Sequence, residues 1–119
     1  MTRSQYEKGM VGQQAAEAYL LNKGYRILAR NFRVPTGEID LIAEDVDYIV
    51  FIEVKSRNGS KYGLPREAVT PRKQARIIET ALHYIAQHEL TGQDFRFDVV
   101  EVLFENHEGR ITHIENAFT

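Results

Sequence analysis

Residues 37–57 read GEIDLIAEDVDYIVFIEVKSR. Two runs rich in β-branched residues, 38–44 and 48–57, flank a short polar turn, which is typical of two strands joined as a hairpin. Most of each run is apolar on both of its alternating faces, so we expect both strands to be buried on two sides. The sequence therefore predicts a central hairpin within a larger sheet.

Asp40 and Glu53 interrupt these apolar runs. Period-two alternation places Asp40 with Glu38 on one face of the first strand, and Glu53 with Lys55 on one face of the second. If the hairpin turns between residues 46 and 47, the numbers of cross-strand partners sum to 93. Asp40 then faces Glu53, and Glu38 faces Lys55. Two carboxylates are thus predicted to project toward one point.

Two facing carboxylates need a compensating charge. Burying an unpaired carboxylate costs several kcal/mol, and Cβ atoms of directly opposed residues lie only about 4.5–5.5 Å apart. A divalent cation held between Asp40 and Glu53 offsets both costs, and carboxylate oxygens favour Mg²⁺ or Mn²⁺. Lys55 lies about 6.6 Å along the strand from Glu53, where it could orient water or neutralise a phosphate. The alternative is that Lys55 forms a structural ion pair with one of the acids.

Two helices and three further strands are predicted around the hairpin. The expected helices span residues 5–23 and 71–89, and the expected strands span 25–33, 38–44, 48–57, 95–104 and 110–115. Gly24 ends the first helix, whose apolar face is assigned to Val11, Ala15 and Ala18, and Thr70 caps the second. Residues 58–65 are expected to form a loop. The predicted fold is α/β with a mixed sheet, in the order α-β-β-β-α-β-β, as one domain over residues 1–119.

Composition excludes several classes of protein. The chain has 119 residues, 43% of them hydrophobic, and no cysteine, which rules out disulfides, thiolate zinc sites and cysteine nucleophiles. No apolar run is long enough to span a membrane, and the N-terminal residues do not resemble a signal peptide. We therefore expect a cytoplasmic protein with no membrane partner.

Positive charge gathers in the first part of the chain. Residues 1–76 hold 13 of the 15 Lys and Arg residues, and residues 54–76 hold seven of them against one acid. Such a stretch is either a solvated basic surface or a phosphate-binding face. In the second case the expected nucleic-acid contacts are Arg57, Lys61, Arg66, Arg72 and Lys73, with Tyr62 placed to stack on bases.

The strand motifs together resemble a known nuclease superfamily. Asp40 followed by Glu53-Val54-Lys55 resembles the PD-(D/E)xK pattern, and GEIDLIA (37–43), VFIEVKSR (50–57), RFDVV (96–100) and Asn-Ala-Phe (116–118) resemble the YraN-type bacterial family. The resemblance implies a restriction-endonuclease-like fold, similar to that of archaeal Holliday-junction resolvases. It also implies that Asp40, Glu53 and the Val54 carbonyl hold Mg²⁺ or Mn²⁺, and that Lys55 is the catalytic lysine.

The first helix departs from the family pattern. Gln13 stands where many relatives carry Glu, and Glu17, one turn away, is a candidate replacement; Glu38 matches the second acidic position of the family. The expected function is metal-dependent phosphodiester hydrolysis on branched or nicked DNA, with a homodimer as a possible assembly. The alternatives are a nuclease-fold DNA-binding module with weak or no catalysis, and a domain outside nucleic-acid biology whose acids form structural ion pairs.

Overall fold

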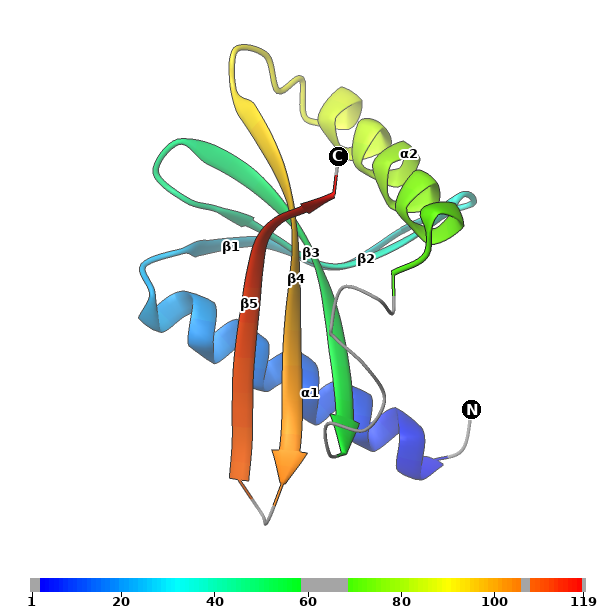
Figure 1. Cartoon of the computed structure of the whole chain (residues 1–119). Helices are drawn as coiled ribbons and strands as arrows, with labels where there is room; N and C mark the ends of the chain where they lie inside the picture. The colour runs from blue at the N-terminus through cyan, green and yellow to red at the C-terminus, as the bar shows by residue number, and fades with distance from the viewer. Residues whose placement is uncertain (1–2, 59–68, 106–107, 119) are drawn as a thin grey trace.

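A computed structural model describes residues 3–58, 69–105 and 108–118 of the chain (Figure 1). Its elements follow the predicted order: α1 (Arg3–Asn22), β1 (Arg26–Val34), β2 (Gly37–Glu44), β3 (Tyr48–Asn58), α2 (Pro71–Gln87), β4 (Asp94–Glu105) and β5 (Glu108–Phe118). Most boundaries lie within two residues of the prediction. The prediction of a short last strand was wrong, because β5 has 11 residues and pairs with β4 as far as Phe118.

The five strands form one mixed sheet in the order β1-β2-β3-β4-β5. β3 and β4 run parallel, while the other neighbouring strands run antiparallel. A parallel pair needs a long crossover connection, and α2 lies within the one that joins β3 to β4. The predicted α/β fold with a mixed sheet is confirmed.

The two helices cover opposite faces of the sheet (Figure 1). Residues of β3 alternate between two apolar clusters, as predicted for a strand buried on both sides. Ile49 and Phe51 pack on the side of α2 with Tyr84, whereas Val50 and Ile52 pack on the side of α1. No helix in the described ranges is long and apolar enough to cross a membrane.

The buried stripe of α1 differs from the predicted one. Val11 is 51% exposed and Ala18 is also exposed, while the buried positions are Gly12, Ala16 and Leu20. The stripe follows the closest approach of α1 to β3: a Cβ atom built on Gly12 would lie 1.7 Å from the Ser56 Oγ. The helix can come this near only where a side chain is missing, so packing against the sheet rather than apolar periodicity selects the face.

The start of α2 is fixed as predicted. Thr70 caps the helix by accepting a hydrogen bond from the Lys73 N–H at 3.2 Å, and Pro71 occupies the first helical position. This cap sets where the first turn of α2 begins. It therefore sets the position of the Lys73 side chain over the sheet.

Candidate active site

The hairpin pairs in the predicted register but separates before reaching the carboxylates. Partners from Leu41↔Ile52 to Glu44↔Ile49 sum to 93, and the described ladder stops at the first of these pairs. Beyond it Ile39 packs on the side of α2, instead of with Leu41 and Ala43 as alternation predicts. The sheet therefore forks between β2 and β3.

Asp40 is the first residue of β2 beyond the ladder. Its Oδ2 atom accepts a hydrogen bond from the Val54 N–H at 2.8 Å, so a side chain takes the place of a ladder bond. The predicted pairing of Glu38 with Lys55 was wrong. Glu38 instead faces Arg33 of β1, whose guanidinium lies 3.1 Å from the Glu38 carboxylate.

The Asp40 and Glu53 carboxyl groups meet at this fork, and each influences the pKa of the other. Both are largely buried; the Glu53 side chain is 17% exposed. Burial and the neighbouring charge of Asp40 together raise the pKa of Glu53 to about 7. Burial also raises the pKa of Asp40, although the Val54 N–H opposes that shift. The pair therefore retains a proton close to neutral pH, where two isolated carboxyls would both be ionised.

Two lysines complete the cluster. The Lys55 ammonium lies 3.6 Å from the Glu53 carboxylate, on the face that alternation predicts. Lys73 reaches in from the first turn of α2, where the nearby Lys55 ammonium lowers the pKa of Lys73, as does partial burial. Lys73 was predicted as a surface contact for nucleic acid. The structure brings it to the carboxylate pair.

The accessory residues of α1 are held at a distance from the pair. Glu17 binds Arg30 through two bonds of 2.6 and 2.7 Å, and this contact lowers the pKa of Glu17. Gln13 binds Asn31 at 2.9 Å, and Asn31 donates in turn to Glu38 at 3.1 Å. Gln13 thus reaches the start of β2 through Asn31.

Sequence reasoning missed Asn31. It lies within β1, yet its φ angle of 51° is left-handed, a conformation that Asn adopts more readily than most residues. An Asn in the middle of an otherwise strand-like run is the one signal that could have drawn attention to it.

The remaining predicted nucleic-acid contacts are spread out. Arg57 pairs with Glu101 of β4 and is mostly buried, and its Nη2 atom has no hydrogen-bond partner among the described residues. Arg72 is exposed on α2. Lys61, Tyr62 and Arg66 lie outside the described residues.

The donor set fits a hard divalent cation. Asp40 and Glu53 offer carboxylate oxygens at one point, as Mg²⁺ or Mn²⁺ requires, and the Val54 backbone lies alongside Asp40. Within residues 3–58, 69–105 and 108–118, no three acidic or histidine side chains form a cluster that could hold a metal ion. An ion here would have Asp40 and Glu53 as its carboxylate ligands, and Mg²⁺ usually keeps several water ligands when few carboxylates hold it.

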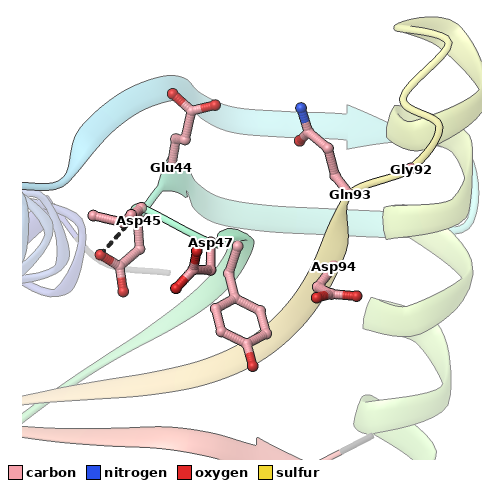
Figure 2. A pocket seen from close by; sticks show the side chains of 8 residues that line it. Glu44, Asp45, Asp47, Gly92, Gln93 and Asp94 are labelled. Carbon is pink, nitrogen blue, oxygen red and sulfur yellow. Dashed lines mark hydrogen bonds between the residues drawn. The ribbon is translucent and has the colours of Figure 1, made fainter.

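An acidic pocket lies at the turn between β2 and β3, at the opposite end of the hairpin from Asp40 and Glu53 (Figure 2). It has a volume of about 500 Å³ and is lined by residues 44–48 and 92–94. Two of its acids already have partners, since Glu44 binds Arg26 at 2.6 Å and Asp45 lies 3.6 Å from Arg96. In Figure 2 the Glu44 and Asp45 carboxylates point in different directions. This pocket holds none of the predicted site residues.

The fold and site define a mixed α/β protein with a buried carboxylate pair and two lysines at a fork in its sheet. Comparison with known proteins gives its family: the chain belongs to UPF0102, described as "Uncharacterised protein family UPF0102", which matches residues 12–102. A UPF0102 protein of Clostridium acetobutylicum is 50% identical over 120 residues, covering 99% of this chain and 98% of that protein. A second, from Clostridioides difficile, is 48% identical and covers 94% of this chain and 96% of its own length. A third, from Syntrophus aciditrophicus, is 51% identical and covers 92% and 87%.

Proposed function

We propose that the chain is a metal-dependent nuclease of the PD-(D/E)xK type with a restriction-endonuclease-like fold, hydrolysing phosphodiester bonds in DNA. One observation carries the proposal: Asp40 and Glu53 meet in a largely buried position, with Lys55 beside them. Glu53 forms an ion pair with Lys55 at 3.6 Å, as the alternative predicts, whereas Asp40 forms no salt bridge shorter than 4.0 Å among the described residues. Such an arrangement favours a site that takes up a cation.

Each residue then has a definite task. Asp40 and Glu53 hold Mg²⁺ or Mn²⁺, which polarises the phosphate and promotes ionisation of water when bound. Asp40 is oriented by the Val54 N–H. Lys55 lies within 4 Å of Glu53, where its charge offsets negative charge that grows on the phosphate. The expected substrate is branched or nicked DNA in the cytoplasm, with two copies of the chain acting together because one small domain encloses a duplex poorly.

A DNA-binding module with weak or no catalysis is the second candidate. It is favoured by the two bonds that hold Glu17 to Arg30 and by the uncharged amide of Gln13, so neither of these two residues offers a free carboxylate to the site. In addition, Lys55 and Lys73 already balance the formal charges of Asp40 and Glu53. A calorimetric titration of the wild-type protein with Mn²⁺ separates the two candidates. If no heat of binding is detected, the DNA-binding module is favoured.

The test is cleavage of labelled branched and nicked DNA with Mg²⁺ or Mn²⁺. We expect Asp40→Asn and Lys55→Ala to lose cleavage while keeping DNA binding. Asp47→Asn is the matched control, since Asp47 is an exposed acid of the same hairpin at its opposite end. Equal cleavage by wild type and by both site variants points to a contaminating nuclease and ends the proposal.

A further inference from the structure

A small pocket adjoins the carboxylate pair. It has a volume of about 180 Å³ and lies between the start of β2 and the first turns of α2, lined by Gly37, Glu38, Glu53, Lys73, Arg76 and Ile77. Glu53 therefore belongs both to the carboxylate pair and to the wall of this pocket. A group bound in the pocket would lie next to the candidate metal ligands.

The walls of the pocket are held in place by close packing. The Thr36 and Thr80 hydroxyls lie 3.4 Å apart, and Thr80 also donates to the Arg76 carbonyl at 2.7 Å. A Cβ atom built on Gly37 would lie 3.0 Å from the Thr80 hydroxyl, which is tighter than ordinary contact. The turn before β2 is thus seated directly on α2. The pocket is therefore a fixed feature of the fold rather than a gap between loosely packed elements.

Positive charge exceeds negative charge in the lining of the pocket. Glu38 contributes little negative charge, because Arg33 neutralises it. With Glu38 offset, the lining carries two formal positive charges, on Lys73 and Arg76, against one negative charge on Glu53. Lys73 and Arg76 lie one turn apart on the same helix, so their side chains reach the pocket from one side. Within the described residues neither forms a salt bridge shorter than 4.0 Å with a carboxylate.

Resting on the proposed function, we propose that this pocket binds a backbone phosphate of DNA, with Lys73 and Arg76 as its ligands. Arg76 is the residue newly assigned here. Its guanidinium presents paired N–H groups that match two phosphate oxygens, and Lys73 adds a compact charge between that phosphate and Glu53. A phosphate in this position offsets the repulsion between Lys55 and Lys73. It also sets the distance between the bound DNA strand and the Asp40 and Glu53 carboxylates that are proposed to hold the metal.

The experiment measures DNA binding without metal, so that it does not depend on hydrolysis. Fluorescent branched DNA is titrated with wild type, Lys73→Ala and Arg76→Ala in buffer containing EDTA. We expect each substitution to raise Kd by about tenfold, and the slope of log Kd against log salt to fall by about one. Arg76→Lys, which keeps the charge but not the paired N–H groups, is expected to lie between Arg76→Ala and wild type. Arg110→Ala is the control, since Arg110 is an exposed cation of β5 that does not line the pocket.

A second measurement separates the sources of phosphate. Amide resonances of Gly37 and Ile77 are followed while sodium phosphate is added, with thermal unfolding as a check that every variant is folded. If Lys73→Ala and Arg76→Ala match Arg110→Ala in DNA binding, the inference is overturned. If free phosphate shifts these resonances but DNA does not bind, DNA is the wrong ligand and the proposed function fails with it. If the two variants weaken DNA binding while Asp40→Asn still cleaves, the proposed catalytic site fails and the phosphate pocket stands.

Discussion

Asp40 serves the fold and the candidate site at once. Its carboxylate accepts a hydrogen bond from the Val54 N–H, and the same carboxyl group lies beside that of Glu53. Removing its charge and removing its hydrogen-bond acceptor are therefore different changes. They can be separated by two substitutions.

We expect Asp40→Asn to fold with nearly wild-type stability, because the amide oxygen of Asn can still accept from Val54. Asp40→Ala leaves that part-buried N–H without a partner and is expected to lose about 1–3 kcal/mol of unfolding free energy. Urea unfolding of the two variants measures the difference. Equal stabilities for Asn and Ala at this position contradict the role given to the Val54 bond.

Glu53 predicts a pH dependence of stability. Because its pKa is raised from 4.5 to about 7, the folded protein binds this proton more tightly than the unfolded chain does. Protonated Glu53 contributes fully to stability below its pKa in the unfolded chain, and this contribution is lost as pH rises through its pKa in the folded protein. The free energy of unfolding should therefore fall between about pH 4.5 and 7. Glu53→Gln cannot ionise and should flatten this part of the curve.

Metal-free urea unfolding of wild type and Glu53→Gln, across that range and in the presence of a chelator, measures the effect. Asp40 shifts in the same direction, so a shallower slope is expected to remain in the variant. Parallel curves for the two proteins contradict the burial assigned to Glu53.

At this scale the sequence predicted the core of the site but not its surroundings. Alternation and register place Asp40, Glu53 and Lys55 together, because both rules are local to one hairpin. The arrival of Lys73 depends on where α2 docks, which is set by contacts between Thr36 and Thr80 that lie 44 residues apart. No local pattern specifies such a contact.

Among the elements, α1 is the one most constrained by a single position. Gly12→Ala puts a Cβ atom 1.7 Å from the Ser56 Oγ and 3.0 Å from the Ser56 Cβ, so the Ser56 hydroxyl must rotate away and a tight contact with its Cβ remains. Ala is the better helix former by about 1 kcal/mol, but the clash costs more, and we expect a net loss of about 1–3 kcal/mol. Thermal and urea unfolding measure this loss.

Gly9→Ala is the control on the same helix, because nothing lies within 4 Å of a Cβ atom built at that position. It should be neutral or slightly stabilising. Ser56→Ala, which removes the nearest atom, should recover part of the stability that Gly12→Ala loses. A Gly12→Ala protein as stable as Gly9→Ala contradicts the close approach of α1 to β3.

β5 shows why strand ends were harder to predict than strand centres. The residues beyond the predicted end are Asn116, Ala117 and the buried Phe118, and Asn116 has a left-handed φ of 52°, which no alternation rule anticipates. The Asn116 N–H donates to the Asp98 carboxylate at 2.9 Å, and this bond helps to hold the end of β5 against β4. A long-range side-chain contact thus extends a strand that local sequence would end earlier.

For the molecule as a whole, Asp98 links β4 to β5 and, through Arg96, to Tyr25. It is fully buried and binds Arg96 through two bonds of 2.9 Å and His113 at 2.7 Å. Arg96 continues to the Tyr25 hydroxyl at 2.6 Å, just after α1. On the α1 side of the sheet, opposite the face that carries Glu53, one carboxylate therefore accepts the hydrogen bonds from both Arg96 and His113.

Asp98→Ala is expected to cost about 3–5 kcal/mol, because it leaves the Arg96 charge buried without its partner. Burial alone would raise the pKa of Asp98, but hydrogen bonds from His113, Arg96 and the Asn116 N–H hold that pKa below its usual value. Its contribution is present above the unfolded pKa and is lost as pH falls through the folded one, the opposite sign to Glu53. Acid unfolding of wild type and Asp98→Asn measures it, and identical acid midpoints contradict the assignment.

The fork between β2 and β3 has a practical consequence. The described ladder between β2 and β3 ends at Leu41↔Ile52. Beyond that point the Val54 N–H donates to the Asp40 carboxylate rather than to a backbone carbonyl of β2. Whatever alters the charge of Asp40, whether a proton, an ion or a substitution, must also alter the environment of that amide. The Val54 amide resonance is thus expected to report on the charge of the Asp40 carboxylate, and it can be followed without any substrate.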